Sequence, residues 1–168
     1  MKIQNDEYGE FYAGYIARCG ERPLMELLET GKEIVISTMQ SISEEDSLYR
    51  YETGKWTIKE VMGHMIDTER IFSYRALALA RGEKIELPGY DHNQYVKEAV
   101  FNRHSLQNLL QQYRSVREAT LVLFSNFQEE ELLRKGRVNQ SGFSVRGLGY
   151  VIAGHELHHI SILKERYL

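Results

Sequence analysis

Two histidines near the end of the sequence, His155 and His159, stand four residues apart in a segment whose apolar residues recur at helical spacing. At about 100° per residue, this spacing puts both imidazoles on one face of a helix, where their ring nitrogens can reach a common point. Such a pair is the helical way of supplying two ligands to a divalent metal ion. His64, on an earlier helical segment, is the candidate third ligand because it lies on a strip that flanks the main apolar stripe and could face a neighbouring helix.

The same three histidines have a second interpretation that needs no metal. An imidazole buried without a partner costs about 1–3 kcal/mol. His64, His155 and His159 could therefore be core residues whose rings bond carbonyls or carboxylates. Since histidine pairs at this spacing also occur without a metal, spacing alone leaves the two interpretations about equally open.

The run from His155 to His159 also fits the H-E-x-x-H string of zinc peptidases, in which Glu156 would be the general base. The context argues against a peptidase. An extended peptidase motif has its third histidine downstream, and that position is Glu165 in this sequence. Glu156 also points about 100° away from the histidine face of the helix. We therefore do not expect peptidase chemistry.

The other three histidines are weaker candidates. His158 lies about 60° from His155 around the helix, on a strip with the small residues Gly147 and Gly154. This strip predicts close helix packing or a subunit contact. His92 and His104 fall in or next to a long connection and are predicted to be solvated.

Charged residues also fall within the apolar stripes. Glu69 and Arg117 lie near the centres of the stripes of two different helical segments, so each needs a partner. The favoured interpretation is a buried Glu–Arg pair, or pairs with Arg70, Arg75 and Asp67, that fix the helix register. The functional alternative is that Arg117 holds a substrate carboxylate while Glu69 or Asp67 orients a metal-bound histidine or water.

Four helical segments must position these residues, because four stretches carry apolar residues at helical spacing and none alternates long enough to build a sheet. The second segment begins with a capping box from Thr57 to Glu60 and runs towards Gly82. The first starts near Pro23, the third near Leu106 and the fourth near Ser144. The sequence therefore predicts an all-α fold, a four-helix bundle.

The connections between these helices are uneven. About 19 residues, Glu83 to Phe101, link the second and third helices, and this length predicts a segment that crosses over the bundle or forms a lid on one end. A short acidic stretch from Gln128 to Lys135 closes at Gly136. Residues 1–21 are too apolar for a solvated tail and are expected to form an N-terminal extension packed on the bundle.

Composition limits the remaining choices. With 168 residues, 42% of them hydrophobic, the sequence predicts a single domain over residues 1–168. A net charge of −3 gives no reason to expect nucleic-acid binding, and no apolar run approaches the ~20 residues of a membrane span. The one cysteine, Cys19, agrees with a cytoplasmic setting.

Three groups of residues resemble the DinB superfamily of DinB/YfiT-like metalloenzymes over nearly the whole chain. They are the run from Trp56 to His64, the run from Ile66 to Arg70 with Tyr74 and Arg75, and the run from Gly154 to His159. A histidine on the second helix combined with the H-x-x-x-H pair on the last helix is a specific pattern, whereas either feature alone would be weak evidence. The extra His158 and the N-terminal extension depart from the simplest family pattern and leave the substrate pocket undefined.

The resemblance implies an up-down-down-up bundle, for which the Glu83–Phe101 crossover is suited. It makes His64, His155 and His159 a metal triad, implies a divalent ion that is commonly zinc or nickel, and implies homodimers. Characterised relatives include thiol-dependent S-transferases that use bacillithiol or mycothiol. We therefore expect transfer of a low-molecular-weight thiol to small electrophiles. Metal-dependent hydrolysis, or a non-catalytic stress-response or binding module braced by the metal, are the alternatives.

Overall fold

The computed structural model describes residues 3–168, and these form seven α-helices and one two-stranded hairpin. Four short 3-10 turns also occur, η1 Asn5–Glu7, η2 Glu10–Tyr12, η3 Asp46–Leu48 and η4 Phe101–Arg103. The helices are α1 Ala13–Cys19, α2 Leu24–Gln40, α3 Ile58–Ala80, α4 His92–Ala99, α5 Leu106–Ser125, α6 Glu129–Leu133 and α7 Val145–Arg166, and the strands are β1 Lys135–Val138 and β2 Ser141–Ser144.

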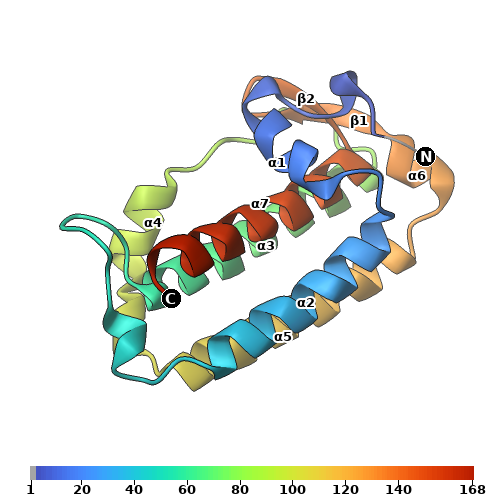
Figure 1. Ribbon diagram of the computed structural model, residues 1–168. Coiled ribbons are helices and arrows are strands. Elements are labelled where there is room, and N and C mark those ends of the chain that lie inside the picture. The colour runs from blue at the N-terminus through green and yellow to red at the C-terminus, as the bar shows by residue number, and fades with distance from the viewer. Residues whose placement is uncertain (1–2) are drawn as a thin grey trace.

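The four long helices, α2, α3, α5 and α7, form the predicted bundle. In Figure 1, α2 and α7 run in one direction and α3 and α5 in the other, which is the up-down-down-up order. Helix α3 packs against both α7 and α5, and α2 packs against the same two helices. The predicted starts of α3 and α7 are confirmed, because Thr57 Oγ1 accepts from Glu60 N at 3.1 Å and Ser144 Oγ accepts from Gly147 N at 2.9 Å.

The Glu83–Phe101 connection returns the chain along the bundle from the end of α3 to the start of α5 (Figure 1). It contains α4, whose start is capped by the Asp91 carboxylate, which accepts from Asn93 N and Gln94 N. A backbone bridge between Leu87 and Val138 joins the connection to the hairpin. The connection thus crosses over the bundle and is anchored to the hairpin near its first residues.

The prediction that no segment forms a sheet is wrong for residues 135–144. The stretch expected to close at Gly136 ends its helix, α6, at Leu133, and Gly136 lies inside β1. Strands β1 and β2 pair antiparallel with Val138 opposite Ser141, and the two residues between them, Asn139 and Gln140, have φ values of 46° and 66°. Two consecutive left-handed residues are the turn that matches the twist of a tight hairpin.

The N-terminal segment packs on α7, as the small-residue strip predicts. A Cβ at Gly154 would collide with the backbone oxygen of Tyr15, and one at Gly147 with the backbone oxygen of Glu7. The Tyr15 ring lies 5.2 Å from the ring of His158. Residues 1–2 of the expected extension lie outside the described part of the chain.

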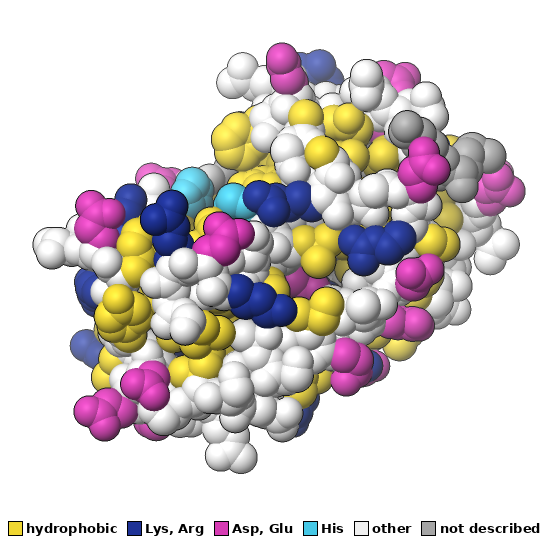
Figure 2. Space-filling view, viewed as in Figure 1, with side chains coloured by type: hydrophobic (Ala, Val, Ile, Leu, Met, Phe, Trp, Pro, Cys, Tyr) yellow, Lys and Arg dark blue, Asp and Glu magenta, His cyan; other side chains and the backbone are white. Residues whose placement is uncertain are grey.

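The core of the bundle consists of two clusters of buried apolar side chains, one at the hairpin end and one at the α4 end. The surface carries basic and acidic side chains interspersed on the face shown in Figure 2. Within residues 3–168, every helix is too short or too polar to cross a lipid bilayer.

Candidate metal centre

Three histidine rings converge between α3 and α7. The Nε2 atom of His155 lies 2.9 Å from Nε2 of His64 and 3.0 Å from Nε2 of His159. One ligand nitrogen from each ring lies within 4.8 Å of the others, and the residues are 7%, 7% and 9% exposed. The structure therefore brings together the three histidines that the sequence predicted, on two neighbouring helices.

The surroundings of these rings separate the two interpretations of the histidines. Within residues 3–168, no carbonyl or carboxylate accepts a hydrogen bond from the three rings, whose hydrogen-bond partners are one another and Thr68. Burial lowers the pKa of His64 to about 4 and, with the neighbouring imidazoles, holds the pKa values of His155 and His159 well below the usual range. Neutral rings that aim three nitrogens at each other form a donor set for a cation.

A hydrogen-bonded chain leads from His64 to the long connection. Thr68, one turn after His64 on α3, has its hydroxyl 3.5 Å from His64 Nδ1 and 2.7 Å from the hydroxyl of Tyr90. On the other side, the His64 ring lies 4.8 Å from Trp56 and 5.6 Å from His92. His92 is exposed, as predicted, but it stands at the histidine cluster, which its position in the sequence did not reveal.

The three histidines line a cavity of about 340 Å³, a size that suits a small molecule. Tyr90 and His92 of the long connection line it too, so the connection both crosses the bundle and walls this cavity. The rest of the wall consists mostly of aromatic and polar side chains, and none of the described residues that line it is acidic. The aromatic side chains are Phe11, Tyr12, Tyr15, Trp56, Phe72 and Tyr90.

The predicted buried Glu69–Arg117 pair is present, and it lies outside this cavity. Arg117 is fully buried and binds Glu69 through two hydrogen bonds of 2.8 Å. Its other donors bind Glu156 and the backbone oxygen of Leu28, so all five N–H groups are used. Asp67 is half-buried and paired with Arg70 at 3.2 Å. None of Asp67, Glu69 and Arg117 lines the histidine cavity.

Glu156 is the residue whose role the sequence left open. It is 3% exposed and accepts hydrogen bonds from Arg117 at 2.6 Å and from the Tyr113 hydroxyl at 2.6 Å. The helical wheel placed it away from the histidines correctly, but did not show that α2 and α5 cover that side of α7. Because its carboxylate is held inside the bundle, Glu156 is not placed as the base of an H-E-x-x-H peptidase.

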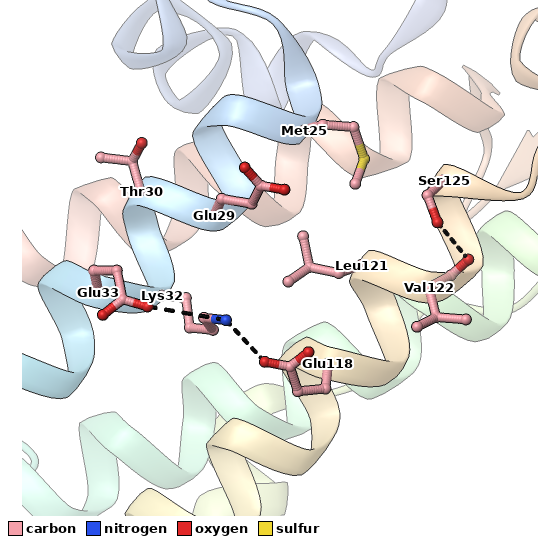
Figure 3. A pocket seen from close by; sticks show the side chains of 9 residues that line it. All are labelled: Met25, Glu29, Thr30, Lys32, Glu33, Glu118, Leu121, Val122 and Ser125. Carbon is pink, nitrogen blue, oxygen red and sulfur yellow. Dashed lines mark hydrogen bonds and ion pairs between the residues drawn. The ribbon is translucent and has the colours of Figure 1, made fainter.

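A larger groove of about 660 Å³ lies between α2 and α5 (Figure 3). The one cation among the described residues that line it is paired, since Lys32 binds Glu118 at 2.8 Å and approaches Glu33 at 3.9 Å. The residues that line it include no histidine and no buried polar group. This groove lacks the features of a reactive site.

A helical bundle with three histidines at one cavity is the architecture of a metal-binding helical protein. The fold is similar to that of YfiT from Bacillus subtilis, described as "a probable metal-dependent hydrolase with an unusual four-helix bundle topology". The match has a TM-score of 0.69 and 16% sequence identity, and covers 98% of this chain and 90% of that one. At this identity the likeness establishes the fold. A search of curated proteins returned no match.

The sequence also matches the family model of the DinB superfamily over residues 27–163. The chain therefore belongs to the DinB superfamily, as the sequence motifs indicated. The matched region begins after the N-terminal segment and includes all three histidines.

Proposed function

We propose that this protein is a metal-dependent enzyme in which His64, His155 and His159 hold a divalent ion, zinc or nickel, and that it transfers a low-molecular-weight thiol to small electrophiles. The convergence of three buried, neutral imidazoles at one cavity carries the proposal. Three uncharged ligands leave the ion's positive charge uncompensated and a coordination position open, as in catalytic zinc sites. A divalent ion held in this way acts as a Lewis acid and lowers the pKa of a thiol or water that it binds.

The residues around the cavity favour a thiol over water as the nucleophile. Hydrolysis benefits from a general base beside the attacking water, and in the H-E-x-x-H zinc hydrolases that base is a glutamate. None of the described residues that line the cavity is Asp or Glu, and Glu156 is turned into the bundle. A thiol that loses its proton on binding a metal needs no such base.

The thiol has to come from outside the chain. Cys19 is the one cysteine in the sequence, and it is fully buried beside the Tyr150 backbone oxygen, 3.5 Å from its Sγ. Burial raises the pKa of Cys19 to about 11, which keeps it protonated at neutral pH. Cys19 also lies outside the cavity lining. The proposal therefore assigns the thiol to a cosubstrate.

Metal-dependent hydrolysis is the second candidate. The likeness of the fold to YfiT, described as a metal-dependent hydrolase, favours it. His92, which lines the cavity and lies 5.6 Å from the His64 ring, is the side chain placed to serve as a base in that case.

One assay tests the proposal and separates the two candidates. Metal-loaded protein is mixed with a chromogenic alkyl or aryl halide, with and without added low-molecular-weight thiols such as bacillithiol and mycothiol. We expect product only when both thiol and metal are present, and loss of turnover in His64→Ala. Turnover that needs the metal but no thiol would contradict the transferase and support the hydrolase.

A further inference from the structure

Arg75 is a buried cation without an acidic partner. Three Lys and Arg residues of the described chain are buried: Lys59 pairs with Glu44 and Arg117 pairs with Glu69 and Glu156. Arg75 is 4% exposed, and no carboxylate of residues 3–168 forms an ion pair with it. An uncompensated buried charge is costly, so this arrangement calls for an explanation.

The protein holds the guanidinium in place without neutralising it. One nitrogen, Nη2, donates to the backbone oxygen of Pro88 at 2.6 Å. The guanidinium carbon lies 4.8 Å from the ring centre of Phe72 and 5.7 Å from that of Tyr90. Burial lowers the pKa of Arg75, and the groups that oppose this shift are tyrosine hydroxyls. These contacts orient the group and leave its charge unpaired.

The unused N–H groups of Arg75 face the histidine cavity. Every fully buried side-chain nitrogen and oxygen of the described residues has a hydrogen-bond partner. The remaining nitrogens of Arg75 have none, so they are in contact with open space. Arg75 lines the cavity that also contains His64, His155 and His159.

The position of Arg75 along α3 indicates that a ligand reaching both Arg75 and the histidines is elongated. It follows His64 by eleven positions on the same helix, which corresponds to about 16 Å along the axis. Between the two, the cavity wall is formed by Thr68 and aromatic side chains that include Phe72 and Tyr90. A molecule that contacts both ends is therefore elongated, with an apolar or aromatic body.

The charge and shape of the Arg75 side chain indicate which anion it binds. Arg75 is the one Lys or Arg among the described residues that line the cavity, and none of them is acidic. Arg75 supplies a single positive charge at its end of the cavity, which matches the single negative charge of a carboxylate. The planar fork of a guanidinium matches the two oxygens of a carboxylate.

We propose that Arg75 binds a carboxylate of the substrate, so that the enzyme acts on elongated small molecules with an aromatic or apolar body, a carboxylate at one end and the reacting group at the histidines. This inference rests on the proposed function, because the reacting group is placed at the histidines only if they hold the catalytic metal. The sequence assigned substrate-carboxylate binding to Arg117 as an alternative, and the geometry points to Arg75 instead.

A matched pair of probes tests this inference in the metal-loaded protein. Biphenyl-4-carboxylate and biphenyl-4-carboxamide have the same shape and differ in charge, and their affinities are measured by calorimetry. We expect the carboxylate to bind about tenfold more tightly or better, since a charge-assisted hydrogen bond is stronger than a neutral one. Equal affinities in the parent protein would overturn the inference without any variant.

Two variants then locate the preference. In Arg75→Gln the carboxylate and the carboxamide should bind with about equal affinity. Arg70→Gln removes an exposed arginine of the same helix and should leave the ratio of the two affinities unchanged. A preference that survives in Arg75→Gln would mean that the carboxylate binds elsewhere, for instance at the metal, and would overturn the inference.

Metal content, measured on the same samples by elemental analysis, separates this inference from the proposed function. Protein that holds the metal but shows no carboxylate preference contradicts only the role of Arg75. Protein that prefers the carboxylate through Arg75 but holds no metal supports that role and contradicts the metal centre.

Discussion

His64 Nε2 lies 2.9 Å from His155 Nε2, although the two residues are separated by 91 positions in the sequence. This contact joins α3 to α7 at the centre of the bundle, and His159 completes the cluster from one turn further along α7. The fold therefore positions three ring nitrogens as a metal site requires.

Removal of the metal should leave the bundle folded. The apolar side chains on both sides of the histidines form the core without an ion, so metal binding adds stability and is not required for folding. We expect the far-ultraviolet circular dichroism at 25 °C to stay helical after chelation, with a lower Tm. Collapse of the helical signal on chelation would support the interpretation of a metal-braced, non-catalytic module.

Loss of Arg117 should destabilise the protein severely. Arg117→Met leaves the carboxylates of Glu69 and Glu156 buried without their counter-ion, and breaking such a pair costs about 3–5 kcal/mol. Urea unfolding measures the change. The control is Arg70→Met, an exposed arginine for which we expect a change within about 0.5 kcal/mol. A cost below about 1 kcal/mol for Arg117→Met would show that the cluster is not a structural pair.

The long helices could be predicted because their apolar spacing and their caps are local features. Thr57 and Ser144 carry the N-cap signals, and the structure uses both. The hairpin could not be predicted, because its strands are only four residues long. Its turn, Asn139–Gln140, also lacks the glycine that normally marks two left-handed residues in a sequence.

Some residues of the site could likewise be predicted from the sequence, and others could not. The spacing of His155 and His159 on one helix is visible in the sequence, and His64 follows from helix amphipathicity. Arg75 and Tyr90 could not be assigned to the cavity, because their meeting depends on the path of the Glu83–Phe101 connection, which no periodic pattern encodes. Family resemblance supplied the triad as a whole.

The N-terminal segment should detach from α7 when its close packing is blocked. In Gly154→Ala the new Cβ meets the backbone of Tyr15, which cannot move aside as a flexible side chain can. We expect a lower Tm and faster proteolysis near residue 15, although alanine favours a helix over glycine by about 1 kcal/mol. Gly142→Ala, where no atom lies within 4 Å of the added Cβ, is the control. A rise in Tm for Gly154→Ala would contradict the packing described here.

Glu7 should make the attachment of this segment sensitive to acid. Burial opposes ionisation of Glu7, but hydrogen bonds from Arg146, Gln4 N and Ser144 outweigh it and lower its pKa below 4.5. A carboxylate with a lowered pKa in the folded state stabilises above its unfolded pKa and loses that contribution as the pH falls through the folded value.

The free energy of unfolding of the parent should therefore exceed that of Glu7→Gln at pH 7 by about 1–3 kcal/mol. The difference should shrink as the pH falls below about 4.5. Denaturant unfolding at pH 7 and pH 3.5 measures both values. A difference that stays constant with pH would mean that the charge of Glu7 is not what holds the segment.

Elemental analysis of the protein, purified without chelator or nickel resin, tests the metal centre most directly. We expect about one divalent ion per chain in the parent and in the control His104→Ala, whose histidine is exposed and is not part of the cluster. We expect a marked loss of the ion in both His64→Ala and His159→Ala. A parent protein without a divalent ion after supplementation with zinc or nickel, or folded His64→Ala and His159→Ala variants that retain the full metal content, would contradict the account.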